Sequence, residues 1–226
     1  MIESASQPTI LITGASRGIG LELARQLSEE GANVIAVCRK ASLELSGVGV
    51  EIIEGVDVSS DEDVAGLADR LEGRRLDWLV NNAGILARES LDDLDFDSIE
   101  RQFRVNSLGP LRVSAALRDN LAKGSKIFVI TSAMGSISDN TSGGYYGYRM
   151  SKAAVNMAFK SLSEDLRDEG IAVFMLHPGF VATDMTRHQG DVPAETAARN
   201  LIERMKELDL ARSGTFRHAR GHDLTW

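Results

Sequence analysis

Two tyrosines in the stretch YYGYRMSK (145–152) are each followed by a base four residues later, Tyr145 by Arg149 and Tyr148 by Lys152. A helix would place either pair on one face. A cation beside a tyrosine favours the phenolate and so lowers the phenol pKa from its usual value of about 10. One ammonium about 4 Å away, at an effective dielectric near 20, supplies about 4 kcal/mol, enough to lower that pKa by roughly three. Either pair therefore predicts a tyrosine that transfers a proton near neutral pH.

The residues around each pair favour Tyr148 over Tyr145. Tyr148 leads into KAAVNMAFKSLSEDL (152–166), whose alanines and spaced apolar residues predict a long helix. Tyr145 follows Ser-Gly-Gly, which predicts a loop in which its pairing with Arg149 is not fixed. We therefore expect Tyr148 and Lys152 to be the reactive pair, and the other two tyrosines to be packing residues or a pocket rim.

Short apolar runs rich in β-branched residues alternate with longer stretches of helical spacing, which is typical of βαβ units with a parallel sheet. The runs predict strands at 9–13, 33–38, 51–56, 76–81, 126–131 and 171–177, with a further strand at 214–216. We therefore expect an α/β fold. It would be one doubly wound Rossmann domain over residues 1–226, with a parallel sheet of about seven strands and helices on both faces.

Two sequence patterns mark helix boundaries. The stretch GLELARQLSEEG (20–31) has helical spacing, and Gly31 predicts its end. Ser59 and Glu62 have the spacing of a capping box, which predicts the start of another helix.

The first predicted strand is followed directly by TGASRGIG (13–20), with glycines at 14, 18 and 20. Gly14 and Gly18 allow a tight turn and a close approach of the backbone to a ligand, and Gly20 allows the next helix to pack against the sheet. The N-terminus of that helix offers free N–H groups to a pyrophosphate. Because the loop joins a strand to a helix, it predicts a dinucleotide-binding site. The alternative is a glycine-rich turn without a ligand.

The end of the second predicted strand indicates which dinucleotide to expect. This position usually carries an acidic residue for the ribose 2′-hydroxyl of NAD, but here the strand ends in AVCRK (36–40). Arg39 can bind a 2′-phosphate with its planar fork of donors, and Arg17 in the glycine loop can approach the phosphate from the other side. We therefore expect NADP(H) to be preferred over NAD(H). The alternative is that both arginines are surface charges.

Six motifs occur in an order that resembles the short-chain dehydrogenase/reductase family over nearly the whole chain. They are TGASRGIG (13–20), NNAG (81–84), VN (105–106), TSAMGS (131–136), YRMSK (148–152) and HPGFVATDM (177–185). The spacing of Ser132 from Tyr148 and the context GSISDNTSGGYYGYRMSKAAVN most resemble the small carbonyl reductases grouped with bacterial C-factor proteins.

The resemblance implies a catalytic tetrad and a set of cofactor contacts. The tetrad consists of Asn106, Ser132, Tyr148 and Lys152. Tyr148 and Lys152 would also contact the cofactor, together with Gly14, Ser16, Arg17, Gly18, Ile19, Arg39, Asp57, Val58, Asn81, Ala83, Gly84, Pro178, Gly179, Val181 and Thr183. Within this set, Asp57 and Val58 would flank the adenine and residues 81–84 would lie along the ribose. Val181 and Thr183 would hold the nicotinamide carboxamide.

Two members of the tetrad have competing interpretations from the residues alone. Ser132 follows the fifth predicted strand at the ligand-binding edge of the sheet, where its hydroxyl can hydrogen-bond a substrate oxygen, but Thr131 and Ser136 are neighbouring hydroxyls. Strand alternation sends Thr131 and Ser132 to opposite sides, and the resemblance selects Ser132. Asn106, taken alone, is more often a structural polar residue than a catalytic one, and its place in the series of motifs reverses that. It precedes Pro110, which permits a local kink. In the family such an asparagine holds a water that links the lysine to solvent.

Bulk properties argue against several classes of function. With 25 basic against 33 acidic residues the chain carries a net charge of −8, which argues against general nucleic-acid or membrane binding. The single cysteine, Cys38, excludes an internal disulfide. The sequence has no run of some 18 apolar residues, so we expect no membrane span. The stretch MIESASQPTILIT lacks a basic signal-peptide region, so we expect a cytoplasmic protein. His218 and His222 have metal-ligand spacing without evident further ligands, so we expect no metal site.

Carbonyl reduction needs a hydride for carbon and a proton for oxygen. The nicotinamide supplies the first and a tyrosine can supply the second. We therefore expect an NADPH-dependent reductase of aldehydes, ketones or quinones. The alternatives are a dehydrogenase working in the oxidative direction, and an NAD(P)-binding sensor or signalling protein of the same fold.

Two further expectations concern the substrate and the assembly. The short segment after Met185 leaves little room for a helical flap, which predicts an open pocket of modest selectivity for a small-molecule carbonyl substrate. The resemblance also implies a homodimer or homotetramer, paired through the helices near 94–120 and after Tyr148.

Overall fold

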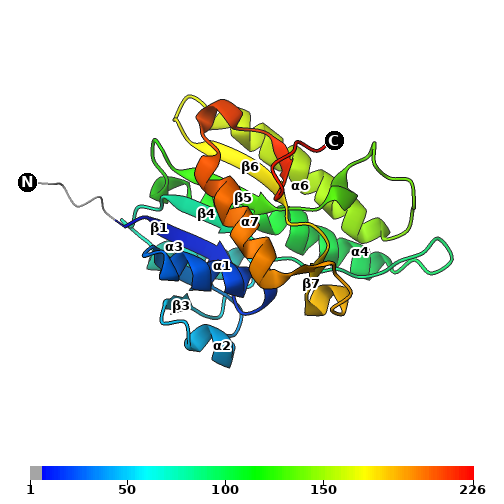
Figure 1. Cartoon of the computed structure of the whole chain (residues 1–226), viewed down its shortest axis with the longest axis horizontal. Helices are drawn as coiled ribbons and strands as arrows, with labels where there is room; N and C mark the ends of the chain where they lie inside the picture. The colour runs from blue at the N-terminus through cyan, green and yellow to red at the C-terminus, as the bar shows by residue number, and fades with distance from the viewer. Residues whose placement is uncertain (1–6) are drawn as a thin grey trace, which may run out of the picture.

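Seven parallel strands form the main sheet of the computed structural model, which describes residues 7–226 (Figure 1). In spatial order they are β3 (Glu51–Ile53), β2 (Asn33–Val37), β1 (Thr9–Thr13), β4 (Trp78–Asn81), β5 (Lys126–Ile130), β6 (Ala172–His177) and β9 (Phe216–His218). The order reverses between β1 and β4, which is the topological switch point of a doubly wound fold. The predicted Rossmann architecture is confirmed. The sequence-based expectation for residues 1–6, that they carry no signal peptide, lies outside the described residues.

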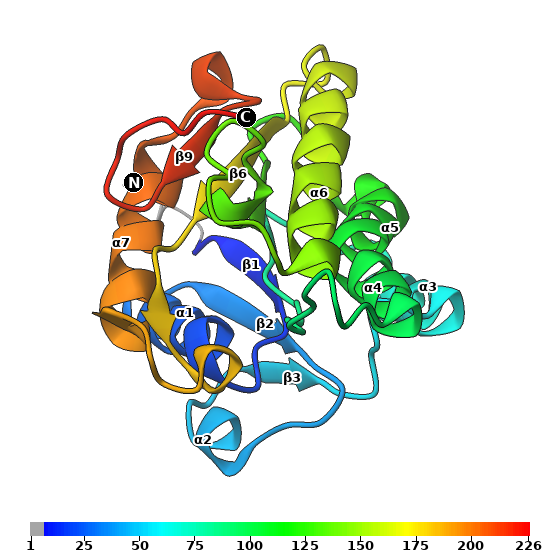
Figure 2. The same cartoon turned by 90° about the vertical axis from the view of Figure 1, so that its right-hand side faces the viewer.

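Helices cover both faces of the sheet, as Figure 2 shows. On one face α1 (Gly18–Glu29) and α7 (Ala194–Glu207) pack against each other. On the other face lie α3 (Asp61–Arg70), α4 (Phe96–Phe103), α5 (Gly109–Ala116) and α6 (Tyr146–Asp165). The short α2 (Leu43–Ser46) follows β2.

Alternate strand residues enter different hydrophobic clusters. In β1, Ile10 and Ile12 pack in the cluster that contains the buried side of α1 and α7. Leu11 packs in the cluster on the opposite face, with residues of α3, α5 and α6. All three side chains are buried because both faces of the sheet are covered, which explains why the strands read as continuous apolar runs in the sequence.

The predicted strands and the first helix end are confirmed, with ends that differ by a few residues. β3 stops at Ile53 because Gly55 has a φ of 79°, outside the extended region. The last strand begins at Phe216, since Gly214 has a φ of 82°. α1 ends at Glu29, and Gly31 follows with a φ of 90°, the conformation expected of a helix stop.

The capping box predicted at Ser59 and Glu62 is wrong by one residue. Ser60 caps α3, because its hydroxyl accepts the Asp63 N–H at 3.1 Å. The Ser59 hydroxyl instead donates to the Asp57 carboxylate at 2.6 Å. The sequence Ser-Ser-Asp-Glu-Asp (59–63) contains two serines that could each cap the helix, Ser59 with Glu62 or Ser60 with Asp63. The turn after β3 selects Ser60.

The chain forms a π-helical segment at Arg104–Leu108, between α4 and α5. Pro110, near the start of α5, has no N–H and cannot bond the Asn106 carbonyl four residues earlier. The irregularity predicted at this proline is therefore confirmed, in the form of a π bulge.

Short turns complete the connections. They are the 3₁₀ segments at Arg118–Asn120, Ala133–Gly135, Asp184–Thr186 and Leu210–Arg212, and a parallel ribbon of β7 (Val181–Ala182) with β8 (Val192–Pro193). The segment between Thr183 and α7 thus contains a single 3₁₀ turn and one short strand, and no helical flap, as expected. None of the helices in residues 7–226 has the length and apolar character needed to cross a membrane.

Candidate active site

A cavity of about 1300 Å³ lies at the carboxyl ends of the strands around β1 and β4. In an open α/β sheet this is the place where ligands bind, because the strand order reverses there. Each of the six sequence motifs contributes at least one residue to the cavity lining. The fold therefore gathers segments that are far apart in sequence around one space.

The glycine loop approaches its surroundings too closely for side chains. Gly14 has a φ of 67°, and a Cβ on it would lie 2.7 Å from the Cα of Ala83. A Cβ on Gly20 would lie 2.4 Å from the Gly14 carbonyl oxygen. Gly18 has a φ of 56° and faces Thr183, whose Cγ2 would be 3.3 Å from an added Cβ. The predicted roles of the three glycines in the turn and in close packing are consistent with this geometry.

The N-terminus of α1 opens into the cavity beside this loop. The helix has no side-chain cap at Arg17 and no acidic residue in its first turn. Its free N–H groups and the positive end of its dipole therefore attract an anion. A dinucleotide pyrophosphate fits this position, because the glycines let the ligand approach the backbone.

Asn82, rather than Asn81, supports the glycine loop. The Asn82 side chain donates to the carbonyls of Thr13 and Gly14 at 3.0 and 3.1 Å. Asn81 lies in β4 with its amide donating to Ser114 at 3.1 Å, and it is not part of the cavity lining. The expectation that Asn81 contacts the cofactor is therefore corrected, since strand alternation turns its side chain into the core.

Basic residues border the end of the cavity next to β2. Arg39 and Lys40 both line it. Burial acts to raise the pKa of Asp57, but hydrogen bonds from Ser59 and the charge of Arg39 lower that pKa below its usual value. Arg39 itself stands at the sequence position where an acidic residue usually binds a ribose 2′-hydroxyl.

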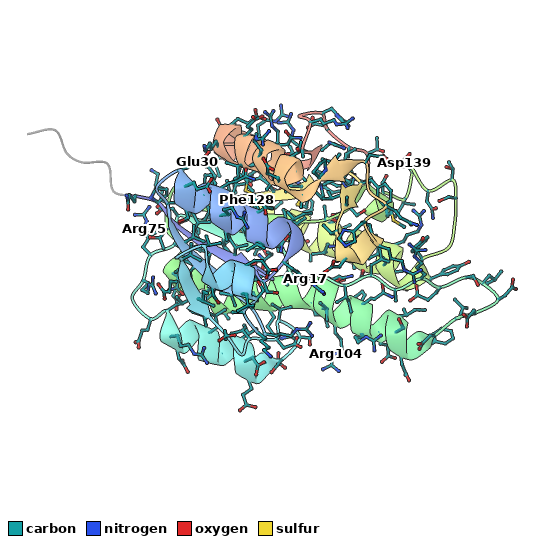
Figure 3. The ribbon with its side chains drawn as sticks, turned by 60° about the horizontal axis from the view of Figure 1, so that its bottom comes forward. Arg17, Glu30, Arg75, Arg104, Phe128 and Asp139 are labelled. Atoms are coloured by element: carbon teal, nitrogen blue, oxygen red, sulfur yellow. The ribbon has the colours of Figure 1, made fainter. Side chains whose placement is uncertain are left out.

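Arg17 has a partner of its own. Its guanidinium lies 3.4 Å from the Asp184 carboxylate, across the mouth of the cavity. In Figure 3 Arg17 is labelled beside the start of α1. Both side chains are exposed, so the pair contributes little stability and Arg17 can turn toward a bound anion.

Tyr148, Ser132 and Lys152 meet inside the cavity. Tyr148 lies in the first turn of α6, where the nearby Ser132 side chain acts to lower the pKa of its hydroxyl. Lys152 follows one turn later, with Nζ 5.7 Å from the centroid of the Tyr148 ring. The same Nζ donates to the Ile130 carbonyl at 2.9 Å. A hydroxyl pair and an ammonium are thus brought to the end of β5, as the sequence predicts.

Tyr145 is held away from this site. It is the N-cap of α6 with a φ of 52°, and the Arg88 guanidinium lies 5.9 Å from its ring centroid. Arg149 reaches the Ser142 hydroxyl at 2.8 Å instead of the Tyr145 ring. Neither Tyr145 nor Tyr146 lines the cavity, and both side chains are half-buried.

The expected lowering of the Tyr148 pKa is wrong for the protein side chains alone. Burial raises the pKa of Tyr148 to about 12, and the Ser132 side chain offsets only part of this effect. Burial also lowers the pKa of Lys152 to about 8. The prediction assumed an ammonium about 4 Å from the phenol and left out the effect of burial, whereas Lys152 is directed at the Ile130 carbonyl.

The neighbouring hydroxyls are engaged elsewhere. Thr131 donates to Asn156 at 2.8 Å, inside α6, and Ser136 donates to the carbonyl of Trp226 at 3.1 Å. Ser132 accepts the Met134 N–H at 3.2 Å, which leaves its own proton free to be donated. The selection of Ser132 is thus consistent with the geometry.

Asn106 is fully buried and lies behind the cavity lining. Its side chain bonds both backbone groups of Ile85 at 2.8 Å and donates to the Ser151 hydroxyl at 3.0 Å. All the polar atoms of the amide are therefore used to hold other segments. Any direct contribution of Asn106 to proton transfer must therefore come from its backbone carbonyl. Pro110, four residues later, has no N–H to donate to this carbonyl.

His177 lies at the end of β6, where it lines the cavity. Burial, with smaller effects of the charges of His218, His222 and Lys152, lowers the pKa of His177 to about 3. The His177 ring packs edge-on against His218, which stacks on His222. His177 thus packs at the end of the strand, and its imidazole is neutral at physiological pH. In the described part of the chain, no group of three or more potential ligands forms a metal site.

Most of the residues implied by the resemblance line this one cavity. They are Gly14, Ser16, Arg17, Gly18, Ile19, Arg39, Asp57, Val58, Ala83, Gly84, Ser132, Tyr148, Lys152, Pro178, Gly179, Val181 and Thr183. Asn81 and Asn106 lie outside the lining.

Several lining residues were missed from the sequence. Asn82 lies within the 81–84 range expected along the ribose, but its bonds to the glycine loop were not predicted, because the period of two in a strand leaves either parity open. Lys40 adjoins Arg39, so its charge was a usable signal. Phe180 and Met185 border the cavity from the segment after β6, and no spacing rule marks them.

Comparisons with known proteins agree with this geometry. A family model described as short chain dehydrogenase matches residues 8–193. The 1-hydroxy-2-glutathionyl-2-methyl-3-butene dehydrogenase of Rhodococcus sp. (strain AD45) is 42% identical over 224 residues, covering 96% of this chain and 99% of that protein. The C-signal protein of Myxococcus xanthus is 42% identical over 154 residues, covering 67% of this chain and 93% of that protein.

Solved structures extend the similarity to the fold. The carbonyl reductase Sniffer of D. melanogaster has a TM-score of 0.91 and 28% identity, covering 98% of this chain and 100% of that chain. The NADPH-bound carbonyl reductase from chicken fatty liver has a TM-score of 0.87 and 28% identity, covering 97% and 99%. On the family match and the full-length relative, the chain belongs to the short-chain dehydrogenase family of oxidoreductases.

Proposed function

We propose that the protein is an NADPH-dependent reductase of small carbonyl compounds, with Tyr148 as the proton donor. The observation that carries the proposal is the meeting of Tyr148, Ser132 and Lys152 in the same cavity as the glycine loop. A carbonyl oxygen bound at this point would accept hydrogen bonds from the Ser132 and Tyr148 hydroxyls. The negative charge that develops on this oxygen would be stabilised by both donors.

Each residue has a separate task in this proposal. Bound NADPH supplies a hydride to the carbonyl carbon. Tyr148 gives its proton to the carbonyl oxygen, and Ser132 holds that oxygen within reach. Lys152 keeps a positive charge close to the Tyr148 ring, which favours the phenolate left behind. Asn106 acts indirectly, because it holds Ile85 and Ser151 on either side of the cavity wall.

The preference for NADPH over NADH is proposed from the charges at the end of β2. Arg39 and Lys40 lie where a 2′-phosphate would extend, and Arg17 is close enough to the mouth to join them. The NADPH bound to the chicken enzyme supports the same assignment. The proposed contacts to the remaining cofactor are those of the lining glycines, of Asp57 and Val58, and of the 178–183 segment.

The substrate side supports a small molecule. Phe180 and Met185 give the cavity an apolar wall, and the segment after Thr183 has no helix to close over a large ligand. We propose aldehydes, ketones or quinones as substrates and, from the family, a homodimer or homotetramer. Exposed apolar side chains on α4 and α6, Phe96, Met150 and Met157, support pairing through these helices.

The decisive experiment measures the loss of NADPH absorbance over a panel of aldehydes, ketones and quinones. Wild-type protein is compared with Tyr148→Phe, and each substrate is tested with NADPH and with NADH. We expect turnover that prefers NADPH and falls by at least about 100-fold in the variant, since general acid catalysis contributes on this scale. Equal rates in the variant and the wild type would overturn the role of Tyr148.

Two relatives favour specific alternatives. The Rhodococcus relative is named as a dehydrogenase of a 1-hydroxy compound, so the same site would work in the oxidative direction. The C-signal relative favours a signalling role with bound cofactor. Reduction of NADP⁺ by alcohols without reduction of carbonyls would support the first. Tight NADPH binding without turnover in either direction would support the second.

A further inference from the structure

The carboxylate of Glu89 is buried close to the proposed proton donor and has no part in the chemistry described above. Glu89 lies between β4 and α4 and is 5% exposed. Three donors face it: Oε1 accepts the Ser98 hydroxyl at 3.2 Å and the Gln102 amide at 2.6 Å, and Oε2 accepts the Gly147 N–H at 3.3 Å. A buried carboxylate is costly unless such bonds satisfy it, so this arrangement needs an explanation.

The start of α6 lacks a cap of its own. Its N-cap, Tyr145, is in the left-handed conformation and makes no side-chain cap bond, and the first turn has no acidic residue. Glu89 supplies both functions from another segment. Its carboxylate accepts the Gly147 N–H, and its backbone carbonyl accepts the Tyr145 N–H at 2.8 Å. The negative charge also lies at the positive end of the helix dipole.

Gln102 fixes the orientation of this carboxylate. Gln102 is fully buried, and its Oε1 accepts the Ala87 N–H at 2.9 Å while its Nε2 donates to Glu89. The amide therefore cannot turn over without losing a bond. A Cβ on Gly147 would lie 2.5 Å from the same Nε2, so the first turn of α6 is pressed against α4.

The same segment is held at its other end. Asn106 bonds both the N–H and the carbonyl of Ile85, and Ile85 lines the cavity. Residues 85–89 are thus fixed to the α4 side by Asn106 and Gln102, and to α6 by Glu89. Tyr148 directly follows Gly147, so a movement of this turn moves the phenol relative to Ser132.

We infer that Glu89 is a positioning residue, which sets the place of the Tyr148 hydroxyl through the Gly147 N–H. This inference rests on the proposed function for its effect on rate. Loss of the bond lets the first turn of α6 shift, whereas Lys152 stays bonded to Ile130 one turn later. A small displacement of the acid lowers the rate of proton transfer and leaves cofactor binding intact.

The test exchanges the two partners. In Glu89→Gln the new NH2 group faces either the Gly147 N–H or the Gln102 NH2 group, and both of these are donors. Gln102 cannot turn its oxygen toward residue 89, because that oxygen accepts the Ala87 N–H. Gln102→Glu alone faces one carboxylate with another. In the double variant Glu89→Gln/Gln102→Glu, the new amide oxygen accepts from Gly147, its nitrogen donates to residue 102, and the carboxylate at 102 accepts from Ala87. The bonds of Gly147, Ala87 and residue 102 are restored with the charge moved by one side chain, and the Ser98 hydroxyl, which can also accept, takes the second amide proton.

We expect Glu89→Gln to lower kcat about 10- to 100-fold with the Kd for NADPH unchanged within about twofold, and the double variant to recover most of this loss. Glu164→Gln, at the exposed far end of α6, is the matched control and keeps the wild-type kcat. The Kd and stoichiometry of NADPH binding report the folded fraction. A wild-type kcat in Glu89→Gln, or a folded double variant no faster than the single one, would overturn the inference.

A second readout needs no substrate. The chain has three tyrosines, so protein labelled with ¹³C-tyrosine gives few ring signals, and Tyr148→Phe assigns the one of interest. We expect that signal to shift in Glu89→Gln and to return in the double variant. A Tyr148 signal that does not move in Glu89→Gln would refute the positional role of Glu89. If the wild type reduces no carbonyl compound, the proposed function fails, but this NMR readout still tests the positional role.

Discussion

Lys152 donates to the backbone carbonyl of Ile130 at 2.9 Å, at the end of the strand that leads to Ser132. The bond anchors the lysine to the sheet and not to the phenol. Because burial lowers the pKa of Lys152 to about 8, this residue changes charge within the range in which many enzymes are assayed. The charge available to a bound cofactor, and to Tyr148, therefore depends on pH.

Affinity for NADPH should fall as the pH rises through the pKa of Lys152. The sign follows from the lowered value: the ammonium is present below about 8 and lost above it. Loss of a charge-assisted donor to the ligand costs about 1.5–3 kcal/mol, so we expect the Kd to rise about tenfold between pH 7 and 9.5. Quenching of protein fluorescence by NADPH measures it. Lys152→Met should bind weakly with no such pH dependence.

The exposed Lys160 on the same helix provides the control. Lys160→Met removes an ammonium that pairs with Glu164 at the surface, and it should retain the wild-type pH profile. An identical pH profile in wild type and Lys152→Met would rule out Lys152 as the titrating group.

Stability should fall in acid because His177 resists protonation in the fold. Its pKa is about 3 in the protein against an ordinary 6.5, so the unfolded chain takes up the proton first as the pH falls. The loss of stability due to His177 is absent above about pH 6.5. It grows as the pH falls toward 3, by at most about 1.4 kcal/mol for each pH unit. Urea unfolding at pH 7.5, 5.5 and 4.5 should show a smaller acid loss for His177→Gln. The exposed His188→Gln should behave as wild type, and equal losses in all three proteins would contradict the prediction.

The sequence was sufficient for the sheet and most of the cavity lining because those features depend on local patterns. Apolar runs separated by helical stretches give strands and their parallel pairing, and a glycine loop between a strand and a helix gives the ligand position. The ribbon of β7 and β8 has two residues in each strand, so no alternation exists to detect. Its pairing depends on contacts between segments that only the fold brings together.

Errors in the predicted site have two physical causes. Parity in a strand is not fixed by composition, so the sequence does not decide which of two adjacent asparagines faces the ligand edge. Asn82 holds the glycine loop, whereas the Asn81 amide donates to Ser114 in the core. Electrostatics depend on burial, which a motif does not encode. The spacing of Tyr148 and Lys152 predicted a lowered phenol pKa, whereas the buried ring has a raised one.

Arg39→Ala should weaken NADPH much more than NADH. Arg39 lies at the cavity end next to β2, and its charge already acts on Asp57. Removal of one charged donor to a phosphate corresponds to about 1.5–3 kcal/mol, or about 10- to 100-fold in the Kd for NADPH. Binding titrations with both cofactors measure the ratio. Arg118→Ala, at a surface pair with Glu169, is the control, and equal weakening of both cofactors by Arg39→Ala would exclude a phosphate contact.

Two glycine substitutions should have opposite effects on the free energy of unfolding. A Cβ on Gly20 would lie 2.4 Å from the Gly14 carbonyl oxygen and 2.5 Å from the Asn82 amide, so Gly20→Ala must displace the bond that holds the glycine loop. We expect a loss of about 1–3 kcal/mol together with weaker NADPH binding. Gly66 in α3 has no atom within 4 Å of an added Cβ, and Gly66→Ala should raise stability by about 0.5–1 kcal/mol through helix propensity. Urea unfolding followed by circular dichroism measures both changes. A Gly20→Ala protein as stable as wild type would contradict the prediction. It would mean that the glycine loop and α1 can move apart at no cost in the free energy of unfolding.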